Sequence, residues 1–270
     1  MRPFTTKHKT IWLCLSGWWA RWLSHIWVIK ALAEHHIIPT HVSGTSMWAI
    51  IAVLYASGYS VENMIHSATT LGRKQILPDW LEFWKSQKKW LLSMKYLHQI
   101  LEHLPQQRLE QLPIPTWISV TNMSQWISTS YHQWDIVPLV MASAAIPWLF
   151  DPIKYEWQLL ADGGIANNFP LEPLLECDII IWSDVNPYQG VDRSIKTQEL
   201  ISRALTISFN QAVVTKAHHC HLFVQPRELD AYHLLDFDKA ETIINLWYQA
   251  TLQQLQHSDN PVIKDYLHTS

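Results

Sequence analysis

Short apolar runs alternate with segments of helical periodicity along most of this chain. Residues 10–16 form an apolar strand candidate, and residues 20–34 carry apolar side chains at the spacing of a helix. A second strand candidate at residues 40–44 runs directly into an apolar helix candidate at residues 47–56. Strands that alternate with helices favour a mostly parallel sheet with helices on both faces. The chain is therefore predicted to be an α/β protein with three layers, α/β/α.

The rest of the chain continues this alternation. Further strand candidates lie at residues 116–122, 127–131, 152–155, 158–161, 178–185 and 221–225. Further helix candidates lie at residues 61–71, 78–88, 93–103, 197–217 and 239–257, and the earlier ones would form a covering region or lid. One domain over residues 1–270 is expected. Its motif-bearing core would span about residues 10–190, followed by a C-terminal strand and helices at residues 195–257.

The composition limits the partners and locations to be expected. With 20 basic and 23 acidic residues, a net charge of -3 and no basic block, the chain is not expected to bind nucleic acid. Its three cysteines are odd in number and widely spaced, which favours the reducing cytoplasm. Arg21 and His25 interrupt the apolar start, so no signal peptide is predicted. The apolar run at residues 136–150 contains two prolines and is too short to span a membrane, so any membrane contact would be peripheral.

One serine lies at a predicted strand-to-helix corner. Gly44-Thr45-Ser46 ends the second strand candidate and precedes the helix candidate at residues 47–56. These residues match the first three positions of the Gly-x-Ser-x-Gly nucleophile elbow, in which a sharp turn lifts a serine hydroxyl above a sheet. A serine at such a corner also serves as a helix N-cap in many proteins. The motif alone leaves both interpretations open.

Three further sequence blocks stand in a fixed order around this corner. They are Gly17-Trp18-Trp19-Ala20-Arg21-Trp22 before it, and Ala142-Ser143-Ala144-Ala145-Ile146-Pro147 and Asp162-Gly163-Gly164 after it. Together with Gly44-Thr45-Ser46-Met47-Trp48, they resemble the four blocks of the patatin-like phospholipases, in the branch of bacterial serine esterases similar to neuropathy target esterase. The resemblance covers roughly residues 10–190.

The resemblance implies a serine hydrolase of lipid acyl esters, with phospholipid or lysophospholipid as substrate and without a metal or other cofactor. It implies that Ser46 is the nucleophile and that Asp162 is the base, taking the serine proton without a histidine. On its own, Asp162 in Asp-Gly-Gly would be interpreted as a turn aspartate. The implied oxyanion hole lies at Gly17, Trp18, Trp19, Ala20 and Arg21. The implied turns of the elbow and of the acid loop are formed by Gly44, Thr45, Met47, Trp48, Gly163 and Gly164.

A run of histidines near the C-terminus has the residue types of metal ligands. It is His218-His219-Cys220-His221. Zinc sites generally need a second spaced pair of ligands, and neighbouring residues of a strand point to opposite faces. No metal site is therefore predicted.

The chain has an unusual balance of glycine and tryptophan. Its 7 glycines are about 12 fewer than the average usage of ~7% would give, while tryptophan reaches 16. Glycine positions of the sequence blocks are occupied by Trp18, Trp19, Trp22 and Trp48. Trp126 and Trp157 lie at tight hairpin turns, where glycine is usual and a bulky residue with φ > 0 would be an outlier. Trp148, directly after Pro147, also stands where glycine would be expected.

One residue type thus replaces one other, while Arg21, Ser46 and Asp162 are kept. The gradual decay of an enzyme would scatter its substitutions over many residue types. We hypothesise that UGA codons in the gene have been translated as tryptophan although the source cell decodes them as glycine, as some bacterial lineages do. Deliberate replacement of glycine by tryptophan is the rival account. If the tryptophans are genuine, the alternative function is a catalytically inactive module that binds lipid or a protein partner.

Overall fold

The computed structural model describes residues 9–16, 24–74, 97–147, 150–170, 173, 176–184, 200, 204, 207–208, 215–226 and 240–269. Its strands are β1 (Ile11–Ser16), β2 (His41–Thr45), β3 (Thr116–Asn122), β4 (Ile127–Tyr131), β5 (Ile153–Tyr155), β6 (Gln158–Asp162), β7 (Ile179–Asp184) and β8 (Leu222–Val224). Its α-helices are α1 (Ser24–Glu34), α2 (Trp48–Ala56), α3 (Val61–Lys74), α6 (Ile136–Ser143), α7 (Gly164–Asn167), α9 (Ala240–Gln256) and α10 (Pro261–Thr269). The helix predicted at residues 78–88 and most of that predicted at 197–217 lie outside the described residues.

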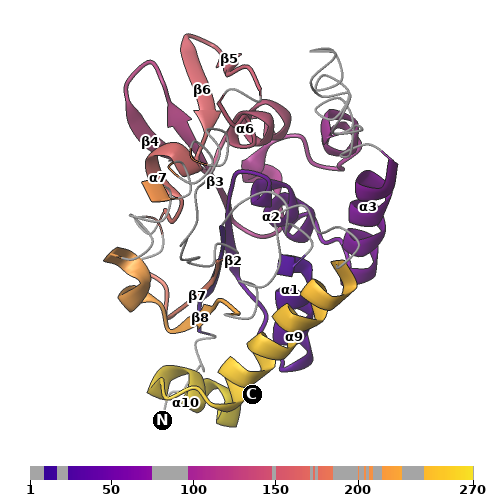
Figure 1. The fold of residues 1–270 in the computed structure, drawn as a ribbon, viewed down its shortest axis with the longest axis vertical. Coiled ribbons are helices and arrows are strands. Elements are labelled where there is room, and N and C mark those ends of the chain that lie inside the picture. The colour runs from indigo at the N-terminus through magenta and orange to yellow at the C-terminus, as the bar shows by residue number, and fades with distance from the viewer. Residues whose placement is uncertain are drawn as a thin grey trace, which may run out of the picture.

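The strands form one mixed sheet with a parallel centre (Figure 1). Neighbouring strands are parallel throughout the series β3-β2-β1-β7-β8. Strand β1 lies in the middle of this series, and all six of its residues are buried. The hairpins β3–β4 and β5–β6 add antiparallel pairs at one end of the sheet. The α/β fold predicted from the alternation of strands and helices is confirmed.

Alternate residues of β1 enter different apolar clusters on the two faces of the sheet. Leu13 and Leu15 belong to the main cluster, to which helices α1, α2, α6 and α9 contribute. Helices α1 and α9 pack against each other although they are far apart in the sequence (Figure 1). Trp12 and Cys14 lie in a smaller cluster with Phe169. Both faces of the central strand are therefore buried, as is usual for parallel sheets.

Strand β3 pairs with both β2 and β6 along the same edge. Residues 118–122 of β3 pair with β4 along one edge. Residues 116–119 pair with β2, and residues 120–122 pair with β6, so both of these strands must use the opposite edge. Thr45 at the end of β2 faces Ser119, and Asp162 at the end of β6 faces the next residue, Val120. The C-terminal ends of β2 and β6 therefore meet, because β2 is parallel to β3 and β6 is antiparallel to it.

The central position of β1 can be tested with two leucines. Leu13 in β1 is fully buried, whereas Leu159 in β6 is 38% exposed. We expect Leu13→Ala to lower the free energy of unfolding by about 2–5 kcal/mol, because it leaves a cavity in the core. Leu159→Ala is the matched control, with an expected change below about 0.5 kcal/mol. Urea denaturation followed by circular dichroism measures both changes, and equal losses would contradict the position of β1 in the core.

Candidate active site

Ser46 occupies a tight corner between β2 and α2. Its backbone has φ of 62°, in the left-handed region that residues other than glycine rarely adopt. The turn is also closely packed, since a Cβ atom on Gly44 would lie 2.6 Å from the Cα atom of Ala49 in α2. At the N-terminus of α2, Met47 is the N-cap residue and makes no side-chain capping bond in the described structure. The corner is therefore a sharp strand-to-helix turn with a left-handed serine, and Ser46 is not the N-cap residue of α2.

The Ser46 hydroxyl points at the carboxylate of Asp162. Ser46 Oγ donates a hydrogen bond of 2.6 Å to Asp162 Oδ2, across 116 residues of sequence. The backbone N–H of Gly164 donates to the other carboxylate oxygen, Oδ1, at 2.8 Å. The expected contact between Ser46 and Asp162 is therefore present, and both oxygens of the carboxylate are held in place.

The surroundings of this pair are almost free of solvent. Asp162 is 1% exposed and Ser46 is 5% exposed. Burial raises the pKa of Asp162 to about 7, although its hydrogen bonds from Ser46 and Gly164 act in the opposite direction. A carboxyl group with this pKa exchanges its proton near neutral pH. It can therefore take a proton from a neighbouring hydroxyl and return it.

The end of α6 holds the backbones of both residues. The N–H of Ser46 donates to Ser143 Oγ at 2.9 Å, and Ser143 Oγ in turn donates to the carbonyl of Ser119 in β3 at 2.6 Å. Two residues further on, the carbonyl of Ala145 accepts the N–H of Asp162 at 3.0 Å. The sequence block at residues 142–147 thus joins the serine corner to the aspartate. Sequence reasoning placed this block in the motif but gave Ser143 no role, because a serine near the end of a helix carries no signal of its long-range partner.

The remaining predicted site residues divide into two groups. Thr45 and Trp48 are buried beside Ser46, and Gly163 is packed so tightly that a Cβ atom there would overlap the Ser119 carbonyl oxygen. Met47 is partly buried against the main cluster. The second group is the predicted oxyanion hole, and it lies outside the described residues: Gly17, Trp18, Trp19, Ala20 and Arg21. Trp22 and Trp148 also lie outside them.

A buried histidine lies near the corner but is engaged elsewhere. The ring nitrogens of His25 are hydrogen-bonded to Ser183 Oγ at 2.7 Å and to the carbonyl of Ser16 at 3.2 Å. Burial lowers the pKa of His25 to about 3, so the ring is neutral at physiological pH. It packs against the Trp48 ring in a T-shaped arrangement, with ring centroids 4.3 Å apart. Within the described ranges, no group of three or more His, Cys, Asp or Glu side chains is arranged to hold a metal ion.

Comparison with known proteins identifies similar chains. Residues 13–175 match the family model of the patatin-like phospholipases. An uncharacterized NTE family protein of Mycobacterium tuberculosis is 30% identical over 176 residues, which are 64% of this chain and 48% of that protein. The lysophospholipase NTE1 of Kluyveromyces lactis is 24% identical over 289 residues, covering 94% of this chain and 20% of that protein. The chain thus spans about half the length of the mycobacterial relative and a fifth of the yeast one.

A solved structure supports the fold. VipD from Legionella pneumophila superposes with a TM-score of 0.54 at 17% sequence identity, over 93% of this chain and 67% of that chain. At this level of identity, the likeness concerns the arrangement of helices and strands.

The raised pKa of Asp162 predicts a specific pH dependence of stability. Because the folded-state pKa of about 7 lies above the ordinary value of 3.8, this group favours folding below the ordinary value and loses that contribution as pH rises through the folded-state value. Asp162→Asn should remove this dependence. The free energy of unfolding of Asp162→Asn minus that of the wild type should therefore increase from about pH 5 upward. The increase should be about 1.4 kcal/mol per pH unit until the folded-state pKa is passed.

Denaturant titrations at about pH 5 and about pH 8 measure the effect, because these values lie on either side of the folded-state pKa. Ser46→Ala is the control, because it removes the hydroxyl but keeps the buried carboxyl group and should keep the pH dependence. The same difference between Asp162→Asn and the wild type at both pH values would contradict a raised pKa.

Proposed function

We propose that this chain, which belongs to the patatin-like phospholipase family, hydrolyses lipid acyl esters through Ser46 and Asp162. The observation that carries the proposal is the 2.6 Å hydrogen bond between the Ser46 hydroxyl and the buried carboxylate of Asp162. Family membership and the likeness to a lysophospholipase favour phospholipid or lysophospholipid as the substrate. No metal or other cofactor takes part in the proposed reaction.

Asp162 acts as the base in the first half of this reaction. It accepts the hydroxyl proton while Ser46 Oγ bonds to the ester carbonyl carbon and forms a tetrahedral intermediate. The intermediate expels the alcohol, which takes up the proton, and leaves the acyl group on Ser46. Water then attacks the acyl-enzyme with Asp162 again as base, releasing the fatty acid and restoring the serine. A base with a pKa of about 7 suits both proton transfers at neutral pH.

The negative charge of the intermediate needs hydrogen-bond donors. We assign this role to backbone N–H groups of the first sequence block, at residues 17–21, by resemblance to the family. The N-terminus of α2, which begins at Trp48 directly behind the serine, adds a favourable dipole. Donors of this kind contribute about 3 kcal/mol each to transition-state stabilisation.

The proposed location is the cytoplasm, with peripheral contact between the protein and its lipid substrate. In the described structure Cys14, Cys177 and Cys220 form no disulfide bond, which is consistent with a reducing compartment. In the part of the chain that the structure describes, no helix is long and apolar enough to cross a membrane.

Replacing either member of the proposed pair should stop turnover. In protein with glycine at positions 18, 19, 22 and 48, we expect Ser46→Ala to abolish ester hydrolysis and Asp162→Asn to lower it nearly as far, by about 10⁴-fold or more. The double variant should lose no more than Ser46→Ala, because the two residues act as a unit. The loss of activity is measured as the rate of fatty-acid release from lysophosphatidylcholine and as the rate of hydrolysis of a chromogenic short-chain ester.

Asp151→Asn, which changes an exposed carboxylate, is the control and should retain full activity. High activity in Asp162→Asn would show that another base serves Ser46. A folded but inactive parent protein would favour the alternative of a lipid-binding or partner-binding module.

Ser143 should affect the rate through the position of Ser46. Ser143→Ala removes the acceptor for the Ser46 N–H, so we expect kcat to fall about 10–100-fold while KM stays nearly constant. Ser143→Thr keeps a hydroxyl and should recover part of the loss. Ser130→Ala is the matched control, because it deletes the neighbouring Ser119–Ser130 hydrogen bond without touching this chain of contacts. A change in KM alone, or equal effects of Ser143→Ala and Ser130→Ala, would contradict a positioning role.

A further inference from the structure

Two tryptophans have backbone conformations that suit glycine. Within the described ranges, φ is positive at five residues other than glycine, and two of these are Trp126 with φ of 61° and Trp134 with φ of 112°. A large side chain at positive φ is an outlier, because its Cβ atom crowds the backbone. Trp134 lies well beyond the left-handed helical region near 57°. The sequence pattern predicted the problem at position 126, whereas position 134 is identified by the structure.

Position 157 behaves differently from the prediction. In the β5–β6 hairpin the residue with positive φ is Glu156, at 53°, and Trp157 is not among the positive-φ residues of the described chain. Residues 156 and 157 form a two-residue turn in which the first position has positive φ. Glycine is favoured at that first position, which is 156 and not 157. The expectation of a left-handed Trp157 is therefore wrong, and position 157 carries no weight in the inference.

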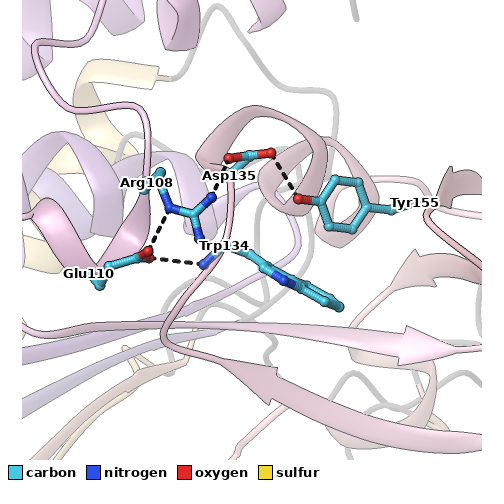
Figure 2. A network of polar contacts seen from close by, with 5 residues as sticks. All are labelled: Arg108, Glu110, Trp134, Asp135 and Tyr155. Carbon is cyan, nitrogen blue, oxygen red and sulfur yellow. Dashed lines mark hydrogen bonds and ion pairs between the residues drawn. The ribbon is translucent and has the colours of Figure 1, made fainter.

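Among the described residues, the polar contacts of position 134 come from its backbone. Its N–H donates to Glu110 Oε2 at 3.0 Å, and its carbonyl accepts the N–H of Leu109 at 2.9 Å. Figure 2 shows how Arg108 bridges Glu110 and Asp135 beside it, with Asp135 also accepting the Tyr155 hydroxyl. Glycine at position 134 would keep this network unchanged. The indole adds ring contacts with Tyr131 and Tyr155.

Position 126 depends even less on its side chain. It closes the turn between β3 and β4, where its N–H donates to the carbonyl of Asn122 at 2.8 Å. The Trp126 side chain is 90% exposed. A left-handed residue that closes a short hairpin loop is usually glycine. The structure therefore uses the backbone of position 126 and leaves the indole in solvent.

We infer that the cell that makes this protein inserts glycine at positions 126 and 134, where UGA codons have been translated as tryptophan. The inference rests on backbone geometry at two positions outside the proposed catalytic pair, so it stands apart from the proposed function. The same decoding at further positions among the 16 tryptophans would account for the shortage of glycine, of which the chain has 7. The same replacement at Trp48 would remove a buried indole whose Nε1 has no hydrogen-bond partner in the described part of the chain.

The coding sequence and the mass of the native protein test the inference directly. We expect UGA at codons 126 and 134, and peptides from the source cell with the mass of glycine at both positions. A UGG codon at either position, or a native peptide with the mass of tryptophan, would overturn the inference. Neither measurement depends on enzymatic activity, so the outcome is independent of whether the protein hydrolyses lipids.

A second experiment isolates the backbone requirement from the loss of the indole. Both Trp126→Gly and Trp126→Ala remove the ring, as do Trp134→Gly and Trp134→Ala. At both positions we expect the glycine variant to have the higher thermal unfolding midpoint, because alanine keeps the Cβ atom. At Trp117, in strand β3, the order should reverse, since glycine weakens a strand. A lower midpoint for glycine than for alanine at 126 and 134 would overturn the inference.

Discussion

The candidate site depends on the meeting of the C-terminal ends of β2 and β6 along one edge of β3. Parallel pairing brings the end of β2 to Ser119, and antiparallel pairing brings the end of β6 to Val120. Asp162 at the end of β6 therefore meets Ser46, which follows the last residue of β2 and is 116 positions away in sequence. A shift of either register by one residue would turn Asp162 or Ser46 away, because side chains alternate between the faces of a sheet. The contact between the Ser46 hydroxyl and the Asp162 carboxylate therefore depends first on the register of these strands.

This junction leaves backbone groups that ordinary sheet pairing cannot satisfy, and the last residue of α6, the segment after it and β3 supply their partners. Ser143 accepts the Ser46 N–H, and the carbonyl of Ala145 accepts the Asp162 N–H. The carbonyl of Asp162 accepts the hydroxyl of Thr121 at 2.8 Å. Buried backbone groups without partners are costly, so the same contacts that satisfy the chain also fix the distance between hydroxyl and carboxylate. The strained φ of Ser46 is held by this arrangement.

The sequence predicted the local features of this arrangement and left out the long-range ones. The strand-to-helix corner at Ser46 follows from a short strand candidate that ends at a glycine and from the apolar run after it, all within a short window. The pairing of Ser46 with Asp162 was predicted from resemblance, since spacing cannot reveal a contact between distant positions. The junction on β3 could not be derived, because the pairing of β3 with β2 and β6, which are distant in sequence, is set by tertiary packing. For the same reason Ser143 and the positive φ at position 134 became visible in the structure alone.

Substituting tryptophan for glycine has different consequences at different positions of one chain. At an exposed hairpin tip such as position 126, the cost is confined to backbone strain, and the strand residues that determine pairing are untouched. Position 134 lies closer to function, because it immediately precedes Asp135, the N-cap residue of α6, the helix that ends at Ser143. In the first sequence block, where the backbone itself is proposed to bind the oxyanion, an indole would compete directly with the substrate for space. A chain containing these tryptophans can therefore retain the strand register that creates the site and still lack the backbone freedom that catalysis requires.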